Sequence, residues 1–248
     1  MKKDTSWGEV AEWYNDVIND KDSYQQQVIL PNLIRAMALR KEDEVLDLAC
    51  GTGFFSGAIA PYARVVGADI GKELIEVAKK HHPKIKFEVT PAHDLSIFND
   101  KQFNKVLIVL AIQNIEEVKQ MLWEVKRVLQ PGGRVYIVMN HPAFRIPKRS
   151  SWGWDEKTNA QYRRLDGYLH ESKEMIEMHP GSKRTEATVS FHRPLQYYTK
   201  LFNATGFAIS RLEEWISHKK SEAGPRQKEE DRIRSEIPLF LFLELVKV

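Results

Sequence analysis

The residues best suited to chemistry stand in one short segment, where an acidic residue and two glycines accompany an apolar run. Asp47 lies within the run 45–48, and Gly51 and Gly53 follow it, ahead of a stretch compatible with a helix. Glycines between a strand and a helix permit backbone conformations of positive φ and let the main chain approach a ligand closely. The segment therefore predicts a ligand-binding loop.

A second carboxylate, Asp69, ends the next apolar run, 65–68. In folds that alternate strands and helices, an acid at this place holds the two ribose hydroxyls of a nucleoside. Ser56 could supply the third small residue of a dinucleotide fingerprint, but that fingerprint has no place for Asp47. A carboxylate repels a pyrophosphate, whereas it accepts hydrogen bonds from an ammonium group or ordered water. The pattern therefore favours a nucleoside other than a dinucleotide.

Short β-branched runs alternate with stretches at helical spacing, a pattern typical of a parallel sheet covered on both faces. We expect strands at residues 45–48, 64–68, 84–89, 105–110 and 134–139. We expect helices at 52–62, 72–81 and 118–129, the last ended by Pro131, Gly132 and Gly133. These elements would bring the carboxylates and glycines to one edge of the sheet.

The alternation lapses over residues 141–191, which are rich in Trp, Tyr, Pro and charged residues, and we interpret this stretch as an insertion. Beyond it we expect a helix at 195–204, a strand at 207–215, an exposed mixed-charge segment at 217–236 and a last strand at 239–246. Residues 1–40 are interpreted as an N-terminal helical cap. The chain as a whole, 1–248, is interpreted as a single domain.

Composition argues against several classes of protein. The 248 residues carry 37 Lys and Arg against 34 Asp and Glu, a net charge of +3 that is too even for a dedicated nucleic-acid binder. Cys50 is the single cysteine, and His170, Glu171 and His179 do not have the spacing of a zinc ligand set, so we expect no metal. No run approaches the roughly 20 apolar residues of a membrane span, and we expect a cytoplasmic protein.

The segment Leu46-Asp47-Leu48-Ala49-Cys50-Gly51-Thr52-Gly53 resembles the first motif of class I S-adenosylmethionine-dependent methyltransferases. The resemblance extends over residues 24–139, through Asp69, Ala92-His93-Asp94-Leu95 and the segment 128–133. It implies an α/β, Rossmann-like, doubly wound sheet of seven mostly parallel strands with helices on both faces. The last strand, 239–246, would be antiparallel and lie beside the strand 207–215.

The resemblance also implies a cofactor, S-adenosyl-L-methionine, with S-adenosyl-L-homocysteine as product. Its methionine portion would lie at the acid and glycine loop, its ribose at the acid after the second strand, its adenine after the third strand and its sulfonium after the fourth. Two tyrosines of the N-terminal helices would close over it. The cofactor-binding residues so assigned are Tyr14, Tyr24, Asp47, Ala49, Gly51, Gly53, Asp69, Ile70, Ala92, His93, Leu110 and Ala111.

The chain departs from the family's pattern at three positions. Ala49 stands where glycine is commoner, and Pro91 stands where an aspartate often binds the adenine amine. Asn104 replaces the aspartate of a common Phe-Asp pair, a change that we interpret as structural.

The loop 111–115, after the fourth strand, separates the branches of the family. It has no run of an Asn or Asp, two prolines and an aromatic, which DNA amino-methylating enzymes carry there. Gln113 and Asn114 are poor ligands for a magnesium ion. Cys50 belongs to the cofactor loop and is no candidate for the nucleophile of cytosine-C5 methylation. What remains resembles the small-molecule methyltransferases of ubiquinone and menaquinone pathways, which methylate an O, N or C atom.

The insertion 141–191 emerges beside the implied cofactor site and is placed to act as a lid over an aromatic or apolar substrate. Its aromatic residues are candidates for substrate contact and equally for packing: Phe144, Trp152, Trp154, Tyr162 and Tyr168. His141 is the candidate general base, or else a histidine bonded to loop backbone. His192 and Arg193 could bind an acidic substrate group or hold their loop. A non-catalytic cofactor-binding protein and an RNA methyltransferase remain alternatives, and the oligomeric state is not indicated.

Overall fold

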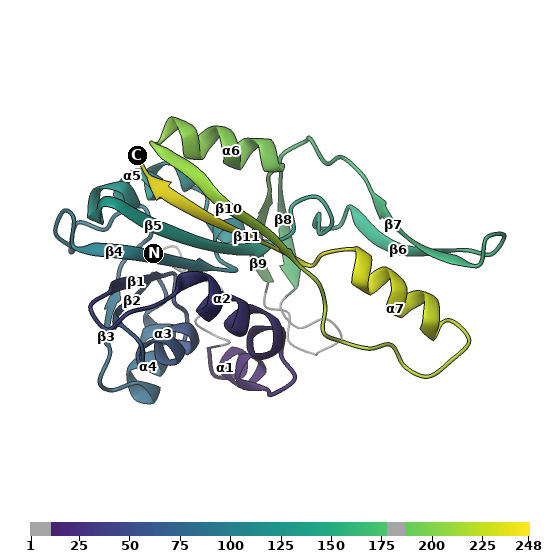
Figure 1. Cartoon of the computed structure of the whole chain (residues 1–248), viewed down its shortest axis with the longest axis horizontal. Coiled ribbons are helices and arrows are strands. Elements are labelled where there is room, and N and C mark those ends of the chain that lie inside the picture. The colour runs from purple at the N-terminus through teal and green to yellow at the C-terminus, as the bar shows by residue number, and fades with distance from the viewer. Residues whose placement is uncertain (1–10, 178–186) are drawn as a thin grey trace.

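The computed structural model describes residues 11–177 and 187–248, with side chains from Asn15 onward. A seven-stranded sheet in the order β10-β11-β5-β4-β1-β2-β3 forms its centre (Figure 1). Only β11 runs antiparallel within this sheet, between β5 and β10. The strands are β1 (Glu44–Leu48), β2 (Arg64–Asp69), β3 (Lys86–Val89), β4 (Phe103–Val109), β5 (Leu129–Asn140), β10 (Phe207–Trp215) and β11 (Phe240–Lys247). The predicted fold class and the place of the last strand are confirmed.

Helices cover both faces of this sheet: α2, α3 and α4 lie on one side, and α5 and α6 lie on the other (Figure 1). Two single-turn elements, η2 and η3, are a π-helix and a 3₁₀-helix. The helices are α1 (Ala11–Asn19), η2 (Gln25–Ile29), α2 (Leu30–Met37), α3 (Phe54–Ile59), α4 (Lys72–His81), η3 (Ile112–Asn114), α5 (Val118–Val128), α6 (Leu195–Ala204) and α7 (Gln227–Glu236).

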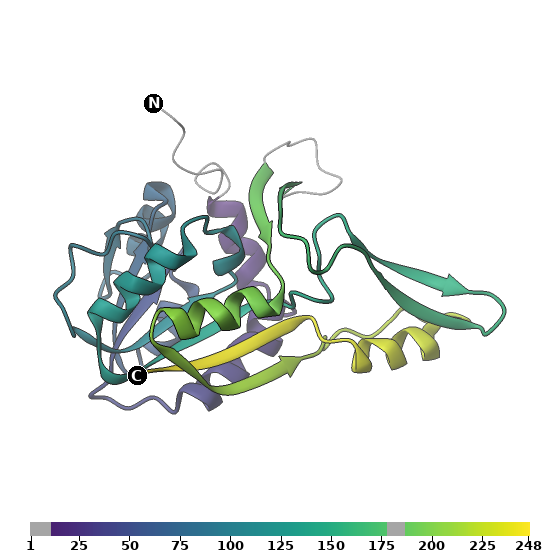
Figure 2. The ribbon, with the colours of Figure 1, turned by 90° about the horizontal axis from the view of Figure 1, so that it is seen from above.

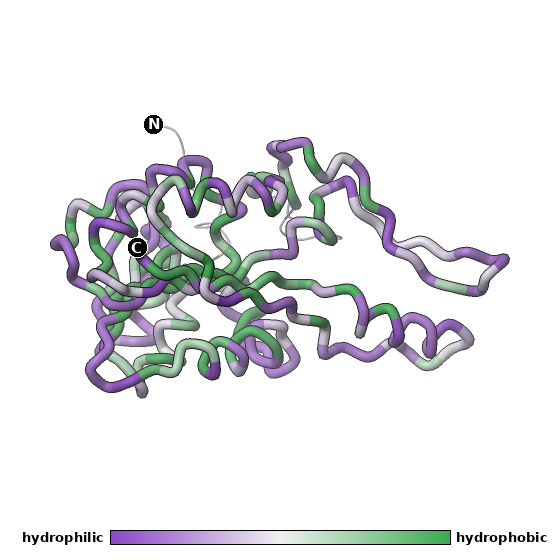
Figure 3. The backbone as a smooth tube through the Cα atoms, turned by 45° about the horizontal axis from the view of Figure 1, so that its top comes forward, coloured by the Kyte–Doolittle hydropathy of each residue, from purple (hydrophilic) through white to green (hydrophobic). Residues whose placement is uncertain are grey.

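Strand alternation divides the core into two layers, because successive side chains of a strand point to opposite faces. In β5, Val135, Ile137 and Met139 pack with α5 and α6, whereas Tyr136 and Val138 pack with η2, α2 and α3. Apolar residues accordingly concentrate along the central strands, while the outlying elements are more hydrophilic (Figure 3). Both faces being covered explains why these strands are nearly continuous apolar runs in the sequence.

Several predicted elements have their predicted bounds, namely 72–81, 195–204 and 207–215, but the glycine-loop helix is shorter than expected. α3 begins at Phe54 because Gly53 has φ of +80°, a left-handed conformation outside the helix. It ends at Ile59, near Pro61, which has no N–H to donate to the next hydrogen bond of the helix.

The predicted end of the helix at 118–129 is also displaced. α5 ends at Val128, before Pro131, because Leu129 already has extended geometry and pairs with Phe103 of β4. Pro131, Gly132 and Gly133 therefore lie inside β5, where the register against β4 shifts. Glycine at 132 suits this irregularity, since its φ is +70°.

The stretch 141–191 contains two β-hairpins. The first is formed by β6 (Ser150–Asp155) and β7 (Ala160–Leu165), and the second by β8 (Ser172–Glu177) and β9 (Ala187–His192). The β6–β7 hairpin extends away from the sheet beside α7 (Figure 2). The function of the stretch 141–191 as a lid stays a prediction. In the part of the chain that the structure covers, no helix combines the length and apolar character needed to cross a membrane.

Three aromatic rings stack in the antiparallel part of the sheet. Substitution of the central ring tests this packing. Phe242 is fully buried, with ring centroids 5.1 Å from Trp215 and 6.5 Å from Tyr136. We expect Phe242→Ala to lower the free energy of unfolding by about 3–5 kcal/mol, measured by urea denaturation. Leu212→Ala, at a 45% exposed residue of β10, is the control and should cost less than about 1 kcal/mol. Equal losses would contradict the packing described.

Candidate functional site

The carboxyl ends of β1, β2 and β4 meet at one edge of the sheet, where the sequence placed its chemistry. Asp47 lies in β1 and is paired in register with Gly67 of β2 and Leu107 of β4. The glycine loop follows β1, and its backbone has positive φ at Ala49, Gly51 and Gly53. Ala49 thus adopts the left-handed conformation that explains why glycine is commoner at this position in the family that the sequence resembles.

Gly53 shows how closely the loop packs. A Cβ atom there would lie 2.9 Å from the ring of Phe87 and 3.1 Å from the Cβ of Ala78. Both the positive φ and this close approach require glycine. The loop is therefore fixed on β3 and α4 rather than free in solvent.

Asp47 is buried at the base of this loop, with 2% of its surface exposed. Its Oδ2 accepts a hydrogen bond from the hydroxyl of Ser56, at 2.6 Å. Ser56 is the residue that the sequence offered as the third small position of a dinucleotide fingerprint. Here it is a partner of the carboxylate instead.

Asp69 organises the loop through backbone N–H groups. Its Oδ2 accepts the N–H of Gly51 at 2.9 Å, and its Oδ1 accepts the N–H of Gly71 at 2.8 Å. Each oxygen of an ionised carboxylate can accept two hydrogen bonds. The carboxylate can therefore still accept a hydrogen bond from a ligand.

The two carboxylates create an unbalanced negative site. Burial, reinforced by the nearby charge of Asp69, raises the pKa of Asp47 to about 7. Burial also raises the pKa of Asp69, and it raises that of the Cys50 thiol well above its ordinary value. Among the described side chains, no Lys or Arg forms an ion pair with either aspartate. A cationic ligand would supply the missing charge, which fits the sulfonium and ammonium groups of the implied cofactor.

The remaining assigned residues follow β2, β3 and β4 at the same edge. Ile70 is 43% exposed, and Ala92 packs partly buried against the core. His93 lies beside α5, with its Nδ1 3.8 Å from Glu117 Oε2. Leu110 has φ of +52° immediately after β4. The fold thus gathers these positions, and their contacts with a cofactor stay predictions.

Gln113 has a role at this edge of the sheet that the sequence did not predict. Its Nε2 donates to the carbonyl oxygen of Leu110 at 2.6 Å, which holds the left-handed residue in place. Its Oε1 is buried without a hydrogen-bond partner, as is the hydroxyl of Thr52 in the glycine loop. A buried acceptor that nothing satisfies marks a position for a ligand or a bound water. The signal in the sequence is the amide side chain that follows the fourth strand.

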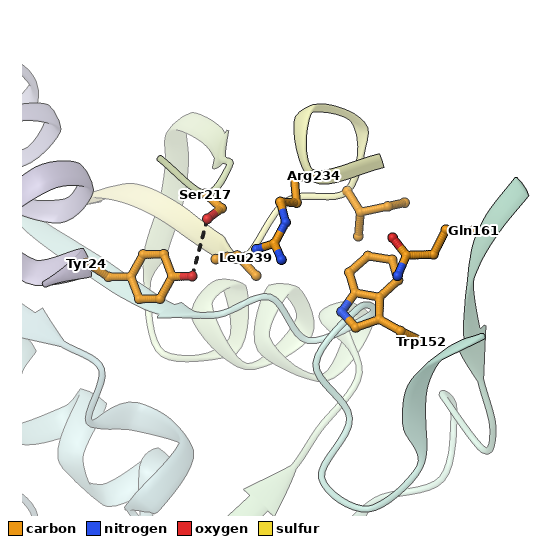
Figure 4. A pocket seen from close by; sticks show the side chains of 7 residues that line it. Tyr24, Trp152, Gln161, Ser217, Arg234 and Leu239 are labelled. Carbon is orange, nitrogen blue, oxygen red and sulfur yellow. Dashed lines mark hydrogen bonds between the residues drawn. The ribbon is translucent and has the colours of Figure 1, made fainter. Parts of the chain in front are cut away.

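Of the two tyrosines assigned to close over the cofactor, the structure describes the side chain of Tyr24 only. Tyr24 packs edge-on against Phe240 and His218, with centroid distances of 5.7 and 5.2 Å, and its hydroxyl lies 3.2 Å from Ser217 Oγ (Figure 4). It therefore faces the start of β11 and the segment after β10. The side chain of Tyr14, in α1, lies outside the described part.

His141 is engaged at both ring nitrogens. Its Nδ1 accepts the N–H of Ala143 at 3.2 Å, so the Nε2 carries the proton and lies 2.8 Å from Glu214 Oε1. Burial lowers the pKa of this histidine. These contacts match the backbone-bonded alternative that the sequence left open, and a function as general base stays a prediction.

The second hairpin is fastened over η3, at the end of β4. Asn114 Nδ2 donates to the carbonyl of Val189 at 2.7 Å, and Arg193 donates to the carbonyl of Ile115 at 2.9 Å. His192 bonds the carbonyl of Tyr168 at 2.7 Å. His192 and Arg193 thus hold their loops, as one of the two alternatives expected.

Metal ligation is not indicated. Within residues 11–177 and 187–248, no group of three or more His, Cys, Asp or Glu side chains is placed to hold a metal ion. His179 lies outside those ranges.

Comparisons with known proteins agree with this geometry. Residues 46–137 match the methyltransferase domain family. Curated relatives include the demethylmenaquinone methyltransferases of Chlorobaculum tepidum, 33% identical over 47% of this chain and 49% of that protein, and of Streptomyces avermitilis, 35% identical over 55% and 59%. The chain spans about half the length of these relatives.

Solved structures cover more of the chain. The S-adenosylmethionine dependent methyltransferase of Mesorhizobium loti has a TM-score of 0.70 at 24% identity, over 87% of this chain and 96% of that one. A putative S-adenosylmethionine dependent methyltransferase of Listeria monocytogenes has 0.69 at 24%, over 88% and 96%. At this identity they establish the fold.

The raised pKa of Asp47 makes stability depend on pH. Its folded pKa of about 7 lies above the ordinary 3.8, so its contribution is complete below about pH 4 and is lost as the pH rises to about 7. Without ligand, Asp47→Asn should therefore gain about 2–4 kcal/mol of unfolding free energy relative to the wild type between pH 4 and 8, measured by urea denaturation. Asp100→Asn, at an exposed carboxylate, should show no such gain. If the difference in unfolding free energy between Asp47→Asn and the wild type did not change with pH, the raised pKa of Asp47 would be refuted.

Proposed function

We propose that this chain, which carries a methyltransferase domain at residues 46–137 on a class I fold, transfers a methyl group from S-adenosyl-L-methionine to a small aromatic or apolar molecule. The observation that carries the proposal is the pair of buried aspartates that lack a cationic partner at the glycine loop. The family match and the quinone-methylating relatives support it. A cytoplasmic location, a small-molecule partner and the absence of nucleic acid are parts of the same proposal.

The chain's own groups fit the cofactor portion by portion. Asp47 would bind the ammonium of the methionine portion, directly or through ordered water, beside Ala49, Gly51 and Gly53. Asp69 would accept hydrogen bonds from the ribose hydroxyls. The other assigned contacts, by Tyr14, Tyr24, Ile70, Ala92, His93, Leu110 and Ala111, keep the places that the resemblance gives them.

When bound, the cofactor would supply an activated methyl group. Transfer would leave the electron pair of the sulfur–carbon bond on sulfur, and the acceptor atom would bond to the methyl carbon and give up a proton. The protein's main contribution is then alignment, which can supply roughly 7–11 kcal/mol. The two hairpins of 141–191 would exclude water from the reacting groups. His141 could take the proton only at its Nδ1, after that atom leaves the N–H of Ala143, because its Nε2 already carries a proton.

The proposal is tested by incubating the protein with methyl-labelled S-adenosylmethionine and a metabolite extract. We expect label in a small molecule, and we expect Asp69→Ala to weaken S-adenosylhomocysteine binding at least tenfold in calorimetry, with loss of transfer. Thermal unfolding checks that the variant folds, because Asp69 also holds the N–H groups of Gly51 and Gly71.

Asp100→Ala is the matched control, since it removes an exposed carboxylate that precedes β4, at the opposite end of that strand from the proposed site. It should leave both binding and transfer unchanged. An Asp69→Ala variant with wild-type affinity would contradict the site. Binding without transfer would favour the non-catalytic alternative, and label recovered in RNA would favour the RNA methyltransferase.

A further inference from the structure

A cavity of about 140 Å³ lies beyond the glycine loop, where elements far apart in the sequence meet (Figure 4). Tyr24 and Ser217 line one side, and Trp152 and Gln161 of the β6–β7 hairpin line the other. An apolar cavity of about 150 Å³ is known to bind benzene, so this volume suits one aromatic ring. The aromatic walls suit such a ring as well.

Arg234 of α7 gives the cavity a positive charge. Its guanidinium points between Tyr24 and Trp152 (Figure 4). Its Nε donates to Ser221 Oγ at 3.0 Å, and no described carboxylate pairs with the group. A guanidinium presents several N–H donors in a planar fork that matches a carboxylate or a phosphate. None of the residues that line the cavity is acidic.

Arg145 adds a second cation near the same wall. Its guanidinium lies 6.0 Å from the ring centre of Phe240, the ring on which Tyr24 packs. No described acidic side chain pairs with it either. Arg163, by contrast, already has partners within the protein, because it donates to the carbonyl of Phe144 and stacks on Trp152.

Other nearby cations are neutralised. Lys219 pairs with Asp22, and Arg226 pairs with Glu156 while stacking on Trp154. The cavity therefore holds aromatic surface and an excess of positive charge together, a combination that favours a ring bearing a negative charge.

The position of the cavity relates it to the proposed transfer site. Leu239, which lines it, precedes β11, and its carbonyl accepts the N–H of His141 at the end of β5. Neighbouring strands lie about 4.8 Å apart, so the start of β11 is on the order of 10 Å from the end of β4, two strands away. The resemblance places the sulfonium at the end of β4. A molecule one or two rings long would reach from one to the other.

We propose that this cavity anchors the methyl acceptor, and that the acceptor is an aromatic molecule with a carboxylate or phosphate group bound by Arg234, with Arg145 as the second cation. The anionic group is the anchor and a different atom receives the methyl group, so the product keeps its negative charge. The inference rests on the proposed function, but ligand binding to the cavity is measured separately from cofactor binding.

The test uses the full chain with single-ring probes: benzoate, phenyl phosphate and benzamide, titrated by saturation-transfer NMR. Benzoate and benzamide match in size and differ in charge. We expect at least one anionic probe to bind fivefold or more tightly than benzamide, and the stronger of the two identifies the anchoring group. Arg234→Gln should abolish the preference. Arg226→Gln, on the same side of the hairpin but outside the cavity lining, should keep it.

Equal binding of all three probes, or a preference that survives in the Arg234→Gln and Arg145→Gln double variant, would overturn the inference. S-adenosylhomocysteine affinity is measured in the same samples and should be unchanged by Arg234→Gln. If the wild type prefers anionic probes but does not bind S-adenosylhomocysteine, the proposed function fails together with the acceptor assignment. If cofactor binds and the labelled product from the extract is uncharged, the acceptor class alone is wrong.

Discussion

The structure depends on two carboxylates held out of water without a cation. Asp47 is bonded by Ser56, and Asp69 by the N–H groups of Gly51 and Gly71. Burying such charge is costly unless something compensates it, and in the described part of the chain the compensation is made of neutral donors. The loop is thereby shaped before any ligand arrives, while its charge remains unbalanced. A cationic nucleoside is the ligand that completes this arrangement.

The rest of the fold serves to bring chemistry to this edge of the sheet. Parallel strands with both faces covered deliver successive loops to one side, and the antiparallel β11 widens the sheet so that the β6–β7 hairpin and α7 extend beyond it (Figure 2). The glycine loop and the arginine-bearing cavity thus lie at the same edge but some strands apart. This separation suits a reaction between two different ligands, a methyl donor at one position and an acceptor at the other.

The parts of the fold and of the site that depend on local sequence pattern could be predicted. The apolar runs fixed the strands, and the acid and glycine loop was found because its chemistry is confined to consecutive residues. The two hairpins were not predicted, because strands exposed on much of their surface lack a clear apolar alternation, as in β8, where half of the residues are exposed. Tyr24 and Arg234 join one cavity from opposite ends of the chain, and no sequence spacing reports such a contact. The mixed charges around Arg234 favoured an exposed segment, but only four of the ten residues of α7 are exposed, and Arg234 is half-buried.

The central claim is that the loop beginning at Asp47 binds a cationic nucleoside and not a diphosphate. Calorimetric titration of the ligand-free protein with S-adenosyl-L-homocysteine and, separately, with NAD tests it most directly. The ammonium group of the former should bind the ionised form of Asp47, so its affinity should increase as the pH rises through about 7, while NAD should give no heat of binding. Saturable binding of NAD, with none of S-adenosyl-L-homocysteine, would contradict the account.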